Sequence, residues 1–431
     1  MNKAVLYTCA LALSLAGKAQ EQKVFTSDID HFWTAYDSIQ TTADTLRQLH
    51  YIQTLYIDKG TEGLKAFMKA RDYTPQLWVK LIRQYPKFWA SIRPNTLAVK
   101  GKAAQIEKSI EKLQELYPQL RPARMYFTIG GLRSGGTTSG DMVLIGAEIA
   151  TGDPQTDVSQ FPNKWLAGVF KEQKLDNIIA LNIHEFVHTQ QKPGGFNNLL
   201  SAAIREGACD FITELVMGAP LPNNYIQYGR AHEPALKEEF KQFMFSKYNN
   251  HWMYNGSAEP VADLGYFMGY AICKSYYNNA GNKKKAIRDI IELNYTEDSV
   301  ERFFKDSKYY TGTLDKEALL KSFEQKRPSV LRVEPFANGD TLVDASIKEL
   351  RIVFSKPMNP QSTTIGYSPK GKDLSPIAGV DDNYTGNNTT LTIRLDMKPG
   401  REYEFVLSDR GFCSAEGFPL KPLTIRFKTK G

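Results

Sequence analysis

Apolar residues recur at helical spacing through residues 20–120, interrupted by Pro86 and Pro94. The clearest amphipathic stripe in this stretch consists of Val99, Ile106, Ile110, Leu113 and Leu116. Apolar residues repeating every three to four positions indicate one buried face of a helix. No group of side chains here points to chemistry. We therefore predict a helical region whose aromatic residues belong to the core.

From Pro122 the pattern changes to that of short strands. Residues 125–129 form a first apolar run that ends at two glycines, and residues 142–146 form a second. The glycine-rich stretch between them, residues 134–140, is predicted to be a flexible loop. Helical patterns then return at 161–174 and 175–191 and in a run around Glu206 that ends at about 217. Further helical patterns follow at 259–280, 287–293 and 315–323.

Beyond Lys326-Arg327-Pro328, apolar and polar residues alternate in short runs separated by turn residues. The predicted strands are 331–333, 350–354, 390–395, 403–407 and 423–427. About 100 residues of regularly spaced strands are typical of a β-sandwich. The predicted fold class is therefore α+β. A mainly helical part with a small sheet, divided into residues 20–120 and 121–327, is followed by an all-β sandwich at residues 328–431.

Residues 1–19 have the features of a secretory signal peptide. A short positive start is followed by an apolar run from Ala4 to Ala16, and Gly17-Lys18-Ala19 supplies small residues for cleavage. The run is too short to span a membrane, and no other stretch approaches that length. We expect an exported bacterial protein, periplasmic or secreted, without a transmembrane span.

Charge and cysteine content argue against nucleic-acid-binding proteins and against disulfide-bonded or redox proteins. The formal charge is +7 with no long Lys/Arg block, so nucleic-acid binding is not expected. Three cysteines follow the signal peptide, namely Cys209, Cys273 and Cys413, and their spacing indicates neither a disulfide framework nor a redox motif.

One segment carries a chemical signature, His184-Glu185-Phe186-Val187-His188, inside an apolar run typical of a helix. In a helix, His184 and His188 leave the same face one turn apart. Two ring nitrogens can then share one zinc ion. Glu185 can reach a metal-bound water and take its proton as that water attacks a carbonyl. The segment therefore predicts one zinc ion per chain and a hydrolytic function.

A tetrahedral zinc site needs a third protein ligand and an open position for water. Glu206 and Asp210 are again four residues apart in a second helix-like run, and Pro193-Gly194-Gly195 predicts a turn between the two runs. Glu206 can then bind the metal while Asp210 orients a ligating histidine from behind. The small residues Gly207 and Ala208 would let this helix pack close to the predicted metal helix.

The motif His-Glu-x-x-His followed by Glu-x-x-x-Asp resembles the gluzincin metallopeptidases, the clan of thermolysin and the aminopeptidases. Glu-Gly-Ala-x-Asp-Phe at 206–211, with Gly-Tyr-x-x-Gly-Tyr at 265–270, resembles more narrowly a bacterial family of predicted zinc-dependent proteases. The resemblance covers about residues 120–300 and implies a zincin-like domain. It implies zinc ligation by His184, His188 and Glu206, with Glu185 as the base. It also implies a hydrogen bond between Asp210 and one of the histidines.

The resemblance also bears on substrate binding. In zinc peptidases a strand just before the metal helix usually runs along the cleft with one free edge, to which an extended peptide adds by backbone hydrogen bonds. The residues given this role are Met142, Val143, Leu144, Ile145 and Gly146. A plain hairpin with a glycine-rich connection is the alternative. Glu148 is a weak candidate for binding a free N-terminal amine.

A tetrahedral transition state needs a hydrogen-bond donor near its oxyanion. Related enzymes take it from a tyrosine or histidine on a later helix. Tyr266 and Tyr270 share a helix face and are the candidates, with Tyr266 preferred. The alternative is that both tyrosines pack in the core with their hydroxyl groups satisfied.

The leading hypothesis is an exported zinc metallopeptidase that hydrolyses peptide bonds in a peptide or protein substrate. Residues 353–358 resemble bacterial Ig-like modules of surface and secreted proteins, so an Ig-like domain is expected at the C-terminus. A second hypothesis is a catalytically inactive peptidase scaffold that binds a cell surface or polysaccharide through that domain. A third is a zinc hydrolase acting on a bond other than a peptide bond.

Overall fold

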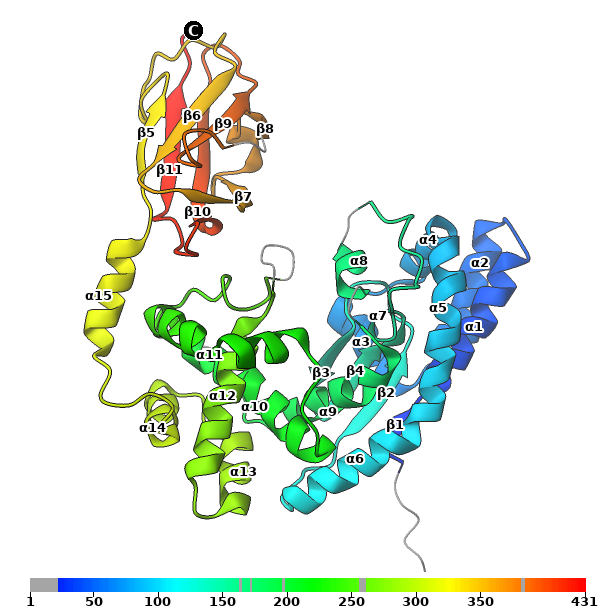
Figure 1. The fold of residues 1–431 in the computed structure, drawn as a ribbon. Helices are drawn as coiled ribbons and strands as arrows, with labels where there is room; N and C mark the ends of the chain where they lie inside the picture. The colour runs from blue at the N-terminus through cyan, green and yellow to red at the C-terminus, as the bar shows by residue number, and fades with distance from the viewer. Residues whose placement is uncertain (1–21, 163–164, 171–172, 196–197, 256–260, 381–383) are drawn as a thin grey trace, which may run out of the picture.

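The computed structural model describes residues 22–431, except 163–164, 171–172, 196–197, 256–260 and 381–383 (Figure 1). The predicted signal peptide, residues 1–19, lies outside the described residues. The chain consists of a mainly helical part with a four-stranded sheet, followed by a part built from two further sheets. The predicted mixture of helix and sheet is thus confirmed.

Short helices with well-defined starts form the N-terminal region. They are α1 (Ser27–Gln40), α2 (Thr45–Tyr51), a π-helical turn (Ile52–Ile57), α3 (Glu62–Arg71), α4 (Pro75–Gln84), α5 (Pro86–Ala98), a 3-10 turn (Val99–Lys102) and α6 (Ala103–Leu116). The side chains of Asp44, Thr61 and Thr74 cap three of them, as N-cap residues do. These helices share one hydrophobic core with the residues that follow, up to Phe323, and with Phe418 of the C-terminal part.

The four-stranded sheet contacts the N-terminal helices α1 and α3 and, through its strand at 136–139, the later helix α9 (Ile178–His188). Its strands are β1 (Val24–Phe25), β2 (Arg124–Thr128), β3 (Gly136–Ser139) and β4 (Met142–Gly146), in the order β1-β2-β4-β3. β2 and β4 are parallel, whereas β3 runs antiparallel to β4. The prediction of a flexible loop at 134–140 is therefore wrong, because residues 136–139 form the edge strand. The two predicted strands also do not form a hairpin with each other.

Helices make up the rest of this part of the chain. They are α7 (Ala147–Ala150), α8 (Trp165–Phe170), a 3-10 turn (Leu175–Asn177), α9 (Ile178–His188), α10 (Leu199–Met217), α11 (Asn224–Phe243), α12 (Leu264–Asn279), α13 (Lys283–Ile291), α14 (Glu297–Ser307) and α15 (Lys316–Lys326). None of the described helices combines the length and hydrophobicity that a membrane crossing requires.

The crossing of α10 and α12 depends on two glycines. A Cβ atom built on Gly207 would lie 2.0 Å from the backbone nitrogen of Tyr270, and one on Gly269 would lie 1.7 Å from the carbonyl oxygen of Ala203. Only glycine permits such a close approach of two backbones. Gly207 thus serves the contact with α12, while α10 also packs against α9, as predicted.

The C-terminal part consists of two antiparallel sheets that share one hydrophobic core. One sheet has the order β11 (Leu423–Lys428), β10 (Glu402–Ser414), β7 (Met358–Tyr367). The other has the order β5 (Val330–Glu334), β6 (Glu349–Phe354), β9 (Thr390–Leu395), β8 (Ile377–Val380), and a 3-10 turn (Lys372–Leu374) precedes β8. All five predicted strands are present, together with β7 and β8. The Ig-like assignment stays a prediction.

Candidate metal centre

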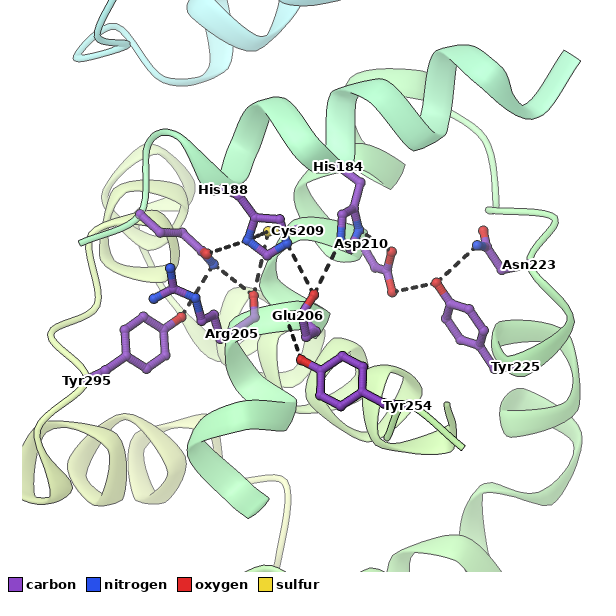
Figure 2. A network of polar contacts seen from close by, with 11 residues as sticks. His184, His188, Arg205, Glu206, Cys209, Asp210, Asn223, Tyr225, Tyr254 and Tyr295 are labelled. Carbon is purple, nitrogen blue, oxygen red and sulfur yellow. Dashed lines mark hydrogen bonds and ion pairs between the residues drawn. The ribbon is translucent and has the colours of Figure 1, made fainter. Parts of the chain in front are cut away.

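Helices α9 and α10 carry the predicted metal ligands. α9 is an apolar run that ends at His188. α10 begins after Asn198, whose side chain accepts a hydrogen bond from the backbone N–H of Ser201 at 2.9 Å, while the Ser201 hydroxyl accepts one from the backbone N–H of Asn198 at 3.2 Å. This reciprocal capping box satisfies amides at the helix start. Figure 2 shows the side chains of the two helices facing each other.

Both histidine rings direct the same nitrogen atom at one carboxylate oxygen. Nε2 of His188 lies 3.2 Å from Oε2 of Glu206, and Nε2 of His184 lies 3.5 Å from the same oxygen. Between 10% and 13% of each of these side chains is exposed. Ligand atoms around a tetrahedral zinc ion, each about 2.0–2.1 Å from the metal, lie about 3.3 Å apart. The two measured distances bracket that separation, so the spacing of each histidine from Glu206 is compatible with a shared zinc ion.

The far side of the His184 ring is held by a carboxylate. Nδ1 of His184 lies 2.8 Å from Oδ1 of Asp210, as predicted. The other oxygen of Asp210 accepts a hydrogen bond from the Tyr225 hydroxyl at 3.1 Å, and this hydroxyl accepts one from the Asn223 amide at 3.0 Å. A hydrogen bond of this kind fixes the tautomer and the orientation of a ligating histidine.

The His188 ring is held by a neutral acceptor that the sequence analysis missed. Nδ1 of His188 lies 2.8 Å from Oε1 of Gln191, whose Nε2 donates to the Arg205 carbonyl oxygen at 2.8 Å. Gln191 follows His188 by three residues, and this spacing is the sequence feature that could have predicted the contact. In both rings Nδ1 therefore faces an acceptor, and the Nε2 lone pair is directed towards Glu206 when the ring is neutral.

The charges in the cluster depend strongly on each other. Burial alone would lower the pKa of His184, but the carboxylates of Asp210 and Glu206 outweigh it and hold that pKa well above its ordinary value. Burial alone would raise the pKa of Glu206, but His184 and His188 hold it well below its usual range. The two opposite shifts have the same cause, the close pairing of the histidine rings with the carboxylates.

Cys209 is the other potential ligand near the histidines. One ligand atom each of His184, His188 and Cys209 lie within 4.8 Å of one another. The Cys209 sulfur, however, lies 3.3 Å from Nδ1 of His188, on the side of the ring away from Glu206. Burial also raises the pKa of this thiol well above its ordinary value. The sulfur therefore lies behind His188, whereas the Nε2 atoms of both histidines face Glu206.

Glu185, the predicted base, points towards the edge strand of the sheet. It is half-buried, and a Cβ atom built on Gly136 of β3 would lie 3.7 Å from its carboxyl carbon. Within the described part of the chain its carboxylate makes no hydrogen bond or salt bridge. This carboxylate remains available for proton transfer, unlike those of Glu206 and Asp210.

The two predicted tyrosines point to different places. The ring of Tyr266 lies nearly parallel to that of His184, with 6.3 Å between the ring centres. The Tyr270 hydroxyl instead donates to Glu214 at 2.7 Å and accepts from Arg230 and Lys274 at 2.6 and 2.8 Å. The catalytic role predicted for Tyr270 is therefore wrong. Glu214, one turn beyond Asp210 on α10, engages its hydroxyl away from the metal centre.

A third tyrosine at the centre was missed. The Tyr254 hydroxyl donates to Oε1 of Glu206 at 3.4 Å (Figure 2). Its backbone has φ 58°, an unusual conformation for a residue other than glycine. No local sequence pattern predicts this placement, because it depends on the path of the chain between α11 and α12.

The predicted substrate strand does not have the expected free edge. Met142, Val143, Leu144, Ile145 and Gly146 form β4, which pairs with β2 on one side and β3 on the other. The prediction of an open edge at 142–146 is therefore wrong, and the outer strand of the sheet is β3.

The structure also excludes Glu148 as an amine-binding residue. This side chain is completely buried, and its oxygens accept hydrogen bonds from the backbone N–H groups of Gly130 at 2.7 Å and Leu132 at 3.2 Å. Its function is to hold the chain after β2.

Comparisons with known proteins add no functional information. Neither a family model nor a curated protein matches this chain. The crystal structure of the S-layer protein rSbsC(31-844) aligns with 12% identity and a TM-score of 0.16, covering 94% of this chain and 44% of that chain. The N-terminal part of the bacterial S-layer protein SbsC aligns with 14% identity and a TM-score of 0.19, covering 76% and 78%. Such TM-scores establish no common fold.

Proposed function

We propose that the chain is a zinc metallopeptidase with one metal ion, as its resemblance to the gluzincins implies. The observation that carries the proposal is the convergence of His184 Nε2 and His188 Nε2 on one oxygen of Glu206. Buried ionisable groups are costly unless they are paired or coordinate a metal, and two imidazoles with one carboxylate are a donor set that zinc prefers.

The residues around the centre support distinct roles in peptide hydrolysis. Zinc bound there would polarise a scissile carbonyl as a Lewis acid and acidify water. The Glu185 carboxylate accepts a proton from the water that attacks the carbonyl carbon, and it returns this proton to the departing amine nitrogen. Burial and the Glu206 carboxylate raise the pKa of Tyr266 well above its usual range. The Tyr266 hydroxyl therefore stays protonated and donates to the carbonyl oxygen as charge develops.

The outer strand β3 is the proposed docking edge for the substrate backbone. It pairs only with β4 in the sheet and passes Glu185 at Gly136. An extended peptide that adds to this edge gains backbone hydrogen bonds with little dependence on its sequence. The role first predicted for residues 142–146 thus passes to residues 136–139.

We also propose, from the sequence of residues 1–19, that the protein is exported. The C-terminal domain is then expected to contact the helical part or a cell surface, as the Ig-like resemblance implies.

Metal analysis and peptide cleavage together test this function. The purified protein is expected to contain about one zinc ion per chain, and Glu206→Ala is expected to lose or weaken that binding. Glu185→Gln is expected to retain zinc while kcat for a cleaved peptide falls by about 100-fold or more. Mass spectrometry of a peptide library after incubation identifies cleaved bonds.

Two results would contradict parts of this proposal. A protein that takes up no zinc even from excess favours the inactive binding scaffold. Full activity in Glu185→Gln would remove that residue from the mechanism.

A further inference from the structure

The segment 249–255, between α11 and α12, brings one hydroxyl group to the metal centre. Tyr254 donates to Oε1 of Glu206, whereas both histidines face Oε2. A donor on the second oxygen of a metal-binding carboxylate restricts its rotation. Because Tyr254 adopts φ 58°, surrounding contacts have to stabilise its backbone conformation.

Hydrogen bonds connect Tyr254 to the beginning of the same segment. The backbone N–H of Tyr254 donates to Asp263 at 2.5 Å, and the backbone N–H of Asp263 donates to the Asn255 side chain at 2.8 Å. The Asn255 amide in turn donates to the carbonyl oxygen of His251 at 2.7 Å. The position of His251 is thereby linked to that of Tyr254.

The C-terminal domain contacts the segment at His251. A Cβ atom built on Gly417, in the turn after β10, would lie 2.4 Å from the His251 ring. The next residue, Phe418, stacks on Phe243 with 4.5 Å between ring centres, and Phe243 lies 5.4 Å from the His251 ring. His251 also pairs with Glu239 of α11 at 3.0 Å. In Figure 1 this end of the C-terminal domain faces α11.

Specific polar contacts hold the domain in this position. The guanidinium group of Arg327, 7% exposed, donates to the carbonyl oxygens of Pro419 at 3.1 Å and Leu420 at 2.8 Å. It lies over the ring of Tyr248, at 4.8 Å from the ring centre. The Tyr248 hydroxyl donates to Asp409 of β10 at 2.7 Å. Buried hydrogen bonds of this kind fix the orientation of two parts.

We propose that the C-terminal domain is a positioning element of the metal centre. By packing Gly417 and Phe418 against His251 and Phe243, it holds the segment 249–255 so that Tyr254 stays bonded to Glu206. This inference rests on the proposed function, because it assumes that Glu206 binds the metal.

A double-mutant cycle in the full-length protein tests the connection. Gly417→Ala displaces the His251 ring, and Tyr254→Phe removes the hydroxyl. Each is expected to weaken zinc binding about tenfold, as the loss of a supporting hydrogen bond does. If both act through Tyr254, the double variant binds about as weakly as either single variant. The matched control is Gly339→Ala, since Gly339 also has a positive φ, 98°, but has nothing within 4 Å of an added Cβ atom.

Chelator competition gives the zinc affinity, and the visible spectrum of the cobalt-substituted protein reports ligand geometry. Hydrogen exchange of peptides within residues 249–255 needs no metal and is expected to accelerate in Gly417→Ala but not in Gly339→Ala. If Gly417→Ala does not fold, Phe418→Leu replaces it in the cycle, because it removes the stacking without backbone strain.

The outcomes separate the two proposals. Absence of zinc binding in the wild-type protein overturns the proposed function. Zinc binding in the wild type, with the domain variants matching Gly339→Ala, overturns the positioning role alone. Losses that multiply in the double variant also overturn it, because the domain would then act independently of Tyr254.

Discussion

Replacing Asp210 by asparagine tests how the charge behind His184 supports metal binding. Asparagine has nearly the same shape, so its oxygen can still accept from Nδ1 of His184 while its amide faces the Tyr225 hydroxyl. The variant therefore removes the negative charge and keeps the hydrogen bond. Asp210 is 2% exposed, so solvent screens its interaction with the ring only weakly.

The expected loss follows from the type of hydrogen bond. A bond to a charged group contributes about 1.5–3 kcal/mol and a neutral one about 0.5–1.5 kcal/mol. The difference between the midpoints of these ranges, about 1.2 kcal/mol, corresponds to about an eightfold weaker zinc affinity. Tyr225→Phe is the matched comparison, because it removes one hydrogen bond to Asp210 and leaves the charge. We expect a loss of about threefold there.

Chelator competition at fixed pH measures both affinities, with circular dichroism as the control for folding. If Asp210→Asn binds zinc as tightly as the wild type, the carboxylate does not support His184 as argued. A larger loss in Tyr225→Phe than in Asp210→Asn would likewise refute the importance of the charge.

Three further predictions concern Glu148, Tyr270 and Tyr266. Burial raises the pKa of Glu148 from 4.5 to about 7, so the folded state binds this proton more tightly than the unfolded state. The free energy of unfolding is therefore expected to fall as the pH rises from about 4.5 to about 7, by up to about 3 kcal/mol. Glu148→Gln is expected to lack that component in urea titrations at both pH values, and an unchanged pH dependence would contradict the assignment. Tyr270→Phe is expected to lower stability by about 1 kcal/mol with kcat within twofold of wild type, because its hydroxyl bonds Glu214; a large fall in kcat would restore a catalytic role. Tyr266→Phe is expected to lower kcat at least tenfold with KM nearly unchanged, and steady-state kinetics that show only a KM effect would argue against it.

The sequence predicts which side chains of the candidate centre lie on one helix face, because helix geometry alone relates them. His184 and His188 are four residues apart, as are Glu206 and Asp210, and regular helices place such pairs on one face. The end of α10 at Met217, predicted at about 217, follows from a local pattern in the same way. These parts need little information about tertiary packing.

The errors all concern relations between distant segments. Tyr266 and Tyr270 share a face of α12, but only the offset of α12 along α10 decides which of them reaches the metal centre. The edge strand at 136–139 was not predicted, because its small and polar residues have the sequence pattern of a loop. Its pairing with β4 is a tertiary contact that single-sequence patterns do not encode.

The glycine contact between α10 and α12 has a consequence for how the centre can be altered. At Gly207 and Gly269 the two helices touch through backbone atoms alone. A change of side-chain rotamer therefore cannot make room for a larger residue at either position. Any added methyl group has to be accommodated by moving α12 as a unit, and Tyr266 moves with it. Substitutions at Gly207 or Gly269 could therefore change the distance between the Tyr266 hydroxyl and the histidines, although neither glycine touches the polar groups of the centre.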